Sequence, residues 1–74
     1  MSDSGLARGA VDTSDAARQL EQAAHDTRVA FDCIALGELD RAHTNAITAR
    51  AAIDAAVTIL AVAVESAGPA SEAD

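Results

Sequence analysis

The fold is decided by the segment CIALGELDRA, residues 33–42, because two long helical patterns meet there. Gly37 lies at the centre of this segment, and neither glycine nor proline occurs between residues 10 and 36. A glycine suits the left-handed residue that follows a helix, and Asp40 is placed to cap a second helix. We therefore predict an all-α fold: an antiparallel two-helix hairpin with a helix over about residues 13–36, a turn near Gly37 and a helix over about residues 39–67.

Two apolar stripes flank this turn. Upstream, small and apolar residues recur at alternating spacings of four and three from Ala16, and residues 12–15 supply candidate N-caps and an acidic first turn. Downstream, a second stripe keeps the same alternation from Leu39 to Ala67. The stripes are out of phase across Gly37, so a turn lets them meet, whereas a straight helix would place them on different sides. One continuous helix kinked at the glycine is the alternative that the pattern leaves open.

We predict that the two stripes pack against each other inside the hairpin. Alanine at every third or fourth position allows two helix backbones to approach closely, at the low end of the usual interaxial range of ~8–10 Å. The predicted intramolecular seam consists of Leu20, Ala23, Thr27, Phe31, Ile34, Leu39, Ala42, Ala46, Ala49, Ile53 and Leu60.

The second helix carries more apolar surface than one contact needs. Between residues 51 and 64 the only polar residues are Asp54 and Thr58, and a helix that is apolar nearly all round is buried on more than one side. Scattered apolar residues are also tolerated in water, but we predict that these surfaces meet a second copy and complete a four-helix bundle as a homodimer. The candidate interface residues are Val29, Cys33, Leu36, Ala55, Ile59 and Val62. On this assignment, Leu60→Asp should unfold the protein and Val62→Asp should mainly dissociate it.

The composition indicates why a single chain makes a weak fold. Apolar residues make up 50% of the 74, but 20 residues are alanine, and the chain has one Phe, one Met and one Cys. A buried alanine contributes one methyl group, about 0.8 kcal/mol, and a short chain with a small core usually needs disulfides, a metal or oligomerisation. One cysteine excludes an intrachain disulfide. We predict one helical unit over residues 12–67, between a flexible tail at residues 1–11 and a flexible acidic tail at residues 68–74.

The charge argues against several classes of partner. The chain has five basic residues, all arginine, and twelve carboxylates, for a net charge of −7. It therefore has no basic patch that could bind nucleic acid or an anionic membrane. The longest apolar stretch, residues 49–64, is interrupted by charges and falls short of the ~20 residues of a membrane span. The first ten residues do not form a signal peptide, and we predict a cytoplasmic protein. The absence of lysine beside abundant alanine indicates a GC-rich coding genome, such as that of an actinobacterium or one of its phages.

Side chains that could carry chemistry are few. His25 and His43 lie on different predicted helices, and no HxxxH, ExxH or CxxC spacing occurs, so no metal site is predicted. Cys33 lies among apolar residues without a nearby base, which is typical of a small buried hydrophobe. No phosphate-binding loop, nucleophile elbow or pair of carboxylates points to a pocket. We predict no enzyme activity, no cofactor and no small-molecule substrate.

The segment from Ala35 to Ala42 resembles the inter-helix turn and second-helix start of a tetratricopeptide repeat. Gly37, Leu39, Asp40 and Ala42 carry the resemblance, which covers about fifteen residues. The first-helix aromatic and the closing proline of that repeat are not matched, and at least three units are needed to bury their faces. We interpret the likeness as shared helix–turn–helix chemistry.

The sequence therefore predicts a non-enzymatic interaction module that self-associates through its alanine-rich second helix and presents an acidic outer surface. The alternative is a small acidic inhibitor, an antitoxin or a phage-encoded blocker, whose carboxylates steer it toward a basic site on one host protein. A structural subunit of a larger assembly, such as a virion component, is a third class. The predicted partner is the chain itself or one other protein.

Overall fold

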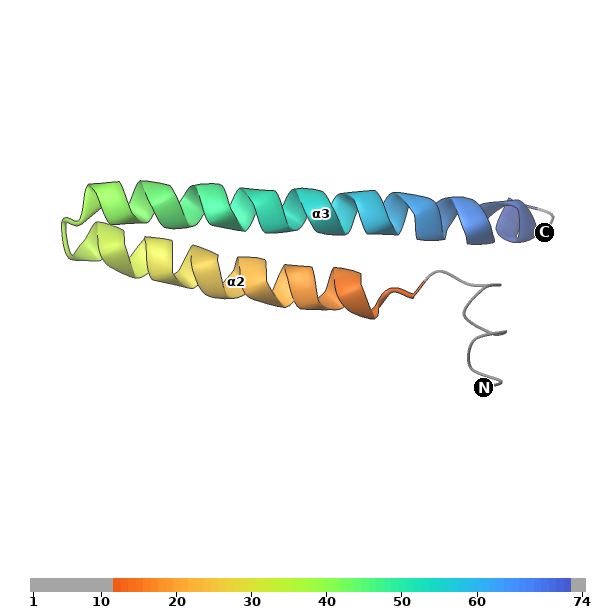
Figure 1. Ribbon diagram of the computed structural model, residues 1–74, viewed down its shortest axis with the longest axis horizontal. Helices are drawn as coiled ribbons and strands as arrows, with labels where there is room; N and C mark the ends of the chain where they lie inside the picture. Colours follow the sequence, from red (N-terminus) through yellow and green to blue (C-terminus); the bar gives the residue numbers. More distant parts are fainter. Residues whose placement is uncertain (1–11, 73–74) are drawn as a thin grey trace.

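The chain forms two long helices joined by a tight turn. The computed structural model describes residues 12–72, with α2 over Ser14–Ala35 and α3 over Leu39–Glu72. The helices run side by side in opposite directions, and α3 continues past the start of α2 (Figure 1). The predicted all-α two-helix hairpin is confirmed for this part of the chain, which contains no strand, and the kinked single helix is excluded. The predicted tail at residues 1–11 and residues 73–74 lie outside the described residues.

Asp12 accepts a backbone hydrogen bond at the start of α2. Its Oδ1 accepts hydrogen bonds from the Ser14 hydroxyl at 2.7 Å and from the Ser14 backbone N–H at 2.9 Å. These bonds, the hydroxyl one above all, favour the ionised carboxylate and hold the pKa of Asp12 below its ordinary value. Thr13 stands at the N-cap position without a side-chain cap hydrogen bond. Asp15 pairs with Arg18 in the first turn, where a carboxylate also interacts favourably with the helix dipole.

The turn confirms the role predicted for Gly37. Its φ of +77° lies in the left-handed region, directly after the C-cap residue Leu36. The Gly37 N–H donates to the carbonyl of Ile34 at 3.0 Å, and the Glu38 N–H donates to the carbonyl of Cys33 at 2.8 Å. This pair of bonds is a Schellman motif, which satisfies carbonyls that a helix end would otherwise leave free.

α3 begins at Leu39, as predicted, but its N-cap residue lies two positions before the predicted one. The carbonyl of Glu38 accepts a hydrogen bond from the Ala42 N–H at 3.0 Å, so Glu38 takes the N-cap position and Asp40 lies within the first turn. The capping role predicted for Asp40 is therefore wrong, although a carboxylate in this turn still favours the helix through the dipole. Arg41 Nη1 donates to Glu38 Oε1 at 3.1 Å across the same turn.

The far end of α3 extends beyond α2. α3 has 34 residues against 22 in α2, and it reaches Glu72 instead of ending near residue 67. Gly68 and Pro69 do not end the helix: Pro69 has no N–H to bond the carbonyl of Glu65, and three further residues of α3 follow it. Both helices rise equally per residue from the turn, so the start of α2 lies beside the region of Leu60. We call residues 61–72 the overhang.

The two helices meet through small side chains. Ala23, Ala49 and Ala52 form the central cluster of the contact. No large apolar side chain of the described residues is fully buried. The buried residues are Ala16, Ala23, Asp26, Ala30 and Cys33 in α2, and Ala42, Ala49, Ala52 and Ala56 in α3.

This contact corrects the predicted intramolecular seam. Ala23, Ala42 and Ala49 are buried as predicted. The remaining members of the predicted seam are exposed: Leu20, Thr27, Phe31, Ile34, Leu39, Ala46, Ile53 and Leu60.

The physical reason for the difference is a rotation of each helix about its own axis. The predicted and observed stripes share every second position, and the other positions of the observed stripe lie one residue earlier in the sequence, about 100° around the helix. The observed stripe uses Cys33 and Ala52 where the predicted one used Ile34 and Ile53. Smaller residues at these positions let the backbones approach more closely, and the larger residues are left outside.

Candidate interaction surface

One broad side of the hairpin carries most of the exposed large apolar side chains. It consists of the positions beside the buried stripe on that side, which repeat every seven residues in both helices. We call it the apolar face. Its members are Leu20, Ala24, Thr27, Phe31 and Ile34 in α2, and Leu39, Ala46, Ile53, Val57, Leu60 and Val64 in α3.

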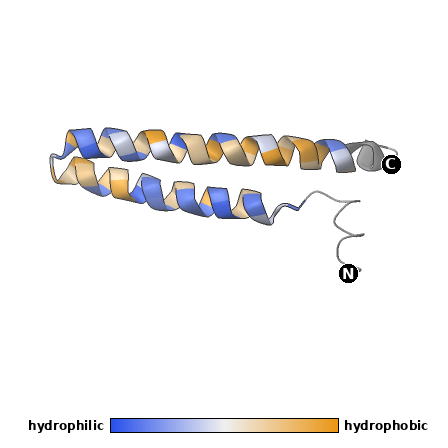
Figure 2. Cartoon of the chain, viewed as in Figure 1, coloured by the Kyte–Doolittle hydropathy of each residue, from blue (hydrophilic) through white to orange (hydrophobic). Residues whose placement is uncertain are grey.

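The two helices contribute unequally to this surface. Figure 2 shows that α2 is mostly hydrophilic over its N-terminal half and hydrophobic near the turn, whereas hydrophobic residues recur along α3. Phe31, the only aromatic residue, is 67% exposed, and Ile34 is 60% exposed. These values are high for large apolar side chains in a folded helix pair, so the apolar face is a surface that requires an explanation.

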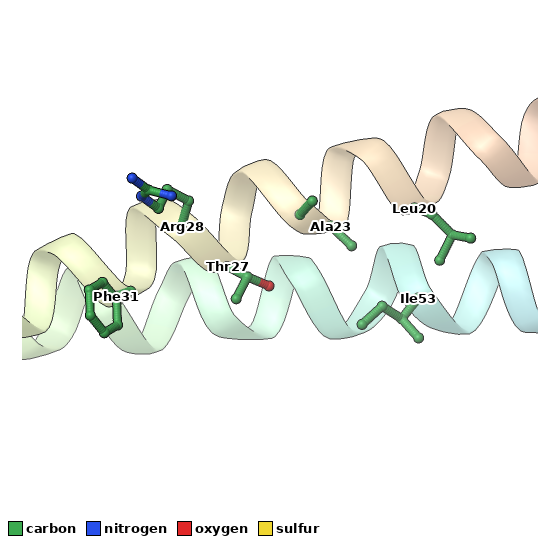
Figure 3. Close-up of a pocket in the computed structure, with 7 residues that line it drawn as sticks. Leu20, Ala23, Thr27, Arg28, Phe31 and Ile53 are labelled. Carbon is green, nitrogen blue, oxygen red and sulfur yellow. The ribbon is translucent and has the colours of Figure 1, made fainter.

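An open groove of about 550 Å³ hollows the apolar face between the helices. Figure 3 shows Leu20 of α2 and Ile53 of α3 on the same side of the hairpin, with the Arg28 guanidinium at the outer edge. The walls come from the larger side chains and the floor from alanine, so the groove is shaped for an apolar group from another molecule. Its lining residues are Leu20, Ala23, Ala24, Thr27, Arg28, Phe31 and Ile53.

The apolar face carries no carboxylate within residues 14–67. In α3 its ionisable residues are His43 and Arg50, which lie in line with Val57 and Val64 at intervals of seven residues, and in α2 Arg28 lies at its outer edge. On a chain of net charge −7, this side of the hairpin is therefore free of the charge that would repel a second copy. The acidic residues of the two helices up to residue 67 lie elsewhere, at Asp15, Glu21, Asp26, Asp32, Asp40, Asp54 and Glu65.

The opposite side of the hairpin is polar in α2. A second hollow of about 420 Å³ lies there and belongs to α2 alone. Three large apolar residues are exposed away from the apolar face, namely Leu36, Ile47 and Val62. The lining residues of the second hollow are Arg18, Gln19, Glu21, Gln22 and His25.

The six candidate interface residues predicted from the sequence do not form one exposed surface. Cys33 is buried inside the hairpin. Val29, Ala55 and Ile59 are half-buried at or beside the buried stripe, and only Leu36 and Val62 are exposed. The rotation that buries the small residues thus turns Cys33 inward and brings Val29, Ala55 and Ile59 partly inward.

Val57 and Val64 belong to the apolar face but were absent from both predicted sets. They follow Ile53 and Leu60 by four residues, and neighbours at this spacing lie on one side of a helix. Widening the predicted stripe by one position would have found both.

Asp26 is a charged residue buried in the contact between the helices. It is 6% exposed, and its Oδ1 accepts a hydrogen bond from Gln22 Nε2 at 3.1 Å. Its Oδ2 is buried without a hydrogen-bond partner. Such an oxygen destabilises the fold by the free energy of its lost hydration. The spacing of the sequence gave no sign of this residue, because Asp26 falls outside the predicted stripe.

The described residues hold no group of three or more His, Cys, Asp or Glu side chains placed to bind a metal ion. Cys33 is a free thiol enclosed between the helices. The surface feature that the packing leaves unexplained is therefore the apolar face.

By length and composition alone, α3 also qualifies as a membrane-spanning helix over Leu39–Ala67. The sequence-based argument that no segment is long enough is wrong by this measure. However, Arg50 and Asp54 lie near the middle of that segment, where a charged side chain in the bilayer centre costs about 2.5–3.5 kcal/mol. α2 is packed along the same helix and is largely hydrophilic. A membrane span over Leu39–Ala67 would therefore place two charged residues inside the bilayer.

Comparisons with protein-family models, with curated proteins and with solved structures give no match for this chain.

Proposed function

We propose that the chain is a non-enzymatic protein–protein interaction module of the cytoplasm that self-associates through the apolar face. The observation that carries the proposal is the reversal of sizes in the hairpin: alanine and Cys33 lie inside, and the large apolar residues lie outside. Eight of the eleven exposed large apolar residues belong to the apolar face, so they form one surface instead of scattered positions.

The extent of the apolar face supports this proposal. Its eight large residues are between 38% and 67% exposed. Single exposed apolar residues are ordinary, whereas a contiguous exposed set marks an interaction site. The second helix supplies the larger part, with Leu39, Ile53, Val57, Leu60 and Val64.

The charge distribution favours a second copy as the partner. In a two-fold interface the same patch lies on both sides, so carboxylates in the patch would be brought close to the partner copy's carboxylates. The apolar face has no carboxylate in residues 14–67, although the whole chain has twelve. A surface with this composition allows two acidic chains to meet without repulsion between carboxylates at the contact.

Size-exclusion chromatography with light scattering tests the proposal at micromolar concentration. A mass of twice 7.5 kDa or a higher multiple is expected, together with a helical circular dichroism spectrum that weakens on dilution. A stable, folded monomer at this concentration would contradict it.

The second candidate function is a small acidic inhibitor of one host protein. The exposed carboxylates outside the apolar face favour it, because they would steer the chain toward a basic site. A chain that stays monomeric alone, and that forms a one-to-one complex with a single purified toxin or host enzyme and blocks its activity, would favour the inhibitor over the self-association module.

A further inference from the structure

The apolar face does not stop where α2 stops. α2 begins at Ser14, which lies beside the region of Leu60. On the overhang the face continues to Val64, which is 66% exposed and, by the number of residues from the turn, lies beyond the start of α2. An arrangement that covers only the part of the hairpin with two helices therefore leaves the end of the apolar face in water.

Two copies that share the apolar face can be related by a two-fold axis in two ways. An axis parallel to the helices places both turns at the same end, with α2 of each copy over α3 of the other. An axis across the helices places the turns at opposite ends, with α2 over α2 and α3 over α3. Neighbouring helices are antiparallel in both arrangements, so helix direction does not decide between them.

We propose that the two hairpins stack with their turns at the same end, an inference that rests on the proposed self-association. In the opposite-end arrangement each overhang extends past the partner's turn and leaves Val64 uncovered. In the same-end arrangement the two overhangs lie together and cover each other. Leu60 and Ala67 are seven residues apart and lie on the edge of the apolar face nearest the buried stripe. In this arrangement each lies at the two-fold axis, beside the same residue of the partner copy.

The same arrangement matches side chains along the helices. Leu20 and Ile53 lie at one level of the hairpin and wall the same groove, so Leu20 of each copy meets Ile53 of the other. Arg50 lies about three residues closer to the turn, and the partner copy's Glu21 is within about one helical turn of it. Arg50 thus gains a nearby carboxylate in the dimer, which adds charge complementarity at the edge of the contact.

Disulfide cross-linking of the full chain distinguishes the two arrangements. Cys33→Ala removes the native thiol and suits the small-residue contact in which Cys33 is buried. Ala67→Cys then places a thiol at the edge of the apolar face on the overhang, and Val62→Cys places one on the opposite side of the same overhang as the control. Ala67 and Val62 are both exposed. Under oxidised glutathione, we expect Ala67→Cys to form a disulfide-linked dimer about tenfold faster than Val62→Cys, because only the first pair is held at high effective concentration.

Light scattering on the same samples separates failure of this inference from failure of the proposed function. With turns at opposite ends, the two positions 67 are more than about 40 Å apart, and a dimeric mass without fast cross-linking overturns the same-end arrangement while self-association stands. Equal rates for the two variants also overturn it, since they report random collisions. A wild-type chain that is monomeric overturns both, and a monomer that floats with phosphatidylcholine vesicles assigns the apolar face to lipid.

Discussion

Leu20 of α2 and Ile53 of α3 wall one open groove from opposite helices, and neither fills the contact between them. Leu20 is 44% exposed and Ile53 is 42% exposed, while Ala23 beside them is buried. The large side chains therefore flank an alanine contact on the outside of the hairpin. This relationship makes the largest apolar groups of the chain available to another molecule.

The first prediction concerns two neighbouring residues on opposite sides of α3. Leu60 is on the apolar face and Val62 is not, and both are partly exposed at 38% and 48%. We now expect Leu60→Asp to dissociate the assembly, with a loss of at least about 2 kcal/mol per chain, which is about 4 kcal/mol per dimer or about a thousandfold in the dimer Kd. Val62→Asp should leave the mass unchanged. Sedimentation equilibrium of the two variants measures this, and dissociation by Val62→Asp alone would rule out the apolar face as the interface.

The second prediction concerns the buried carboxylate of Asp26. Its Oδ2 has no partner, and Asp26→Ala would extend the run of alanines inside the hairpin. We expect this substitution to raise the free energy of unfolding by about 1–2 kcal/mol. Urea unfolding at one fixed chain concentration measures the change, because association also contributes to apparent stability. The exposed Asp32→Ala serves as control and should change stability by less than about 0.5 kcal/mol; a destabilised Asp26→Ala variant would mean that Asp26 makes a favourable contact.

The third prediction is a pH dependence at the start of α2. The hydrogen bonds from Ser14 hold the pKa of Asp12 below its ordinary value of 3.8. Because the folded-state pKa is lower than the unfolded one, ionised Asp12 contributes stability that is fully present above about pH 4 and is lost as the pH falls through the folded-state pKa. Amide exchange in the first turn should therefore increase at acidic pH. An NMR titration checks this: Ser14→Ala should raise the pKa of Asp12 toward 3.8, and an unchanged pKa would contradict the assignment.

The fourth prediction separates the turn from a continuous helix. Gly37 has a φ of +77°, and a Cβ added there would meet no atom within 4 Å. Gly37→Ala should thus destabilise the hairpin by about 1–2 kcal/mol through backbone strain alone. Gly37→Asn should lose less, since asparagine tolerates this conformation better. An increase in both helicity and stability for Gly37→Ala would instead indicate one straight helix.

Much of this fold follows from local sequence. The run without glycine or proline before Gly37 predicts a helix, and the glycine predicts its left-handed end, because both depend on interactions within a few residues. The end of α3 was less predictable. Gly68 and Pro69 disfavour helix but do not stop it, and local propensity is only a weak guide at a helix terminus.

Local sequence does not determine which side of each helix packs against the other helix. The stripe through Leu20 and Ile34 and the stripe through Asp26 and Cys33 share the same alanines, and both alternate at three and four residues. Periodicity predicts that a stripe packs, but two overlapping stripes satisfy it equally. Placing larger apolar residues inside was a reasonable expectation for a single chain, and it was wrong for Leu20 and Ile34.

The sequence by itself determined two helices, the position of the turn and an excess of apolar surface, since each of these depends on short-range spacing and composition. Only the tertiary structure decided which residues face inward. That choice depends on the distance between the helix axes, and close approach selects Ala23, Ala49 and Ala52 while it turns Leu20 and Ile53 outward. The physical reason is that alanine contributes little by its own burial but permits backbone contact along the whole hairpin.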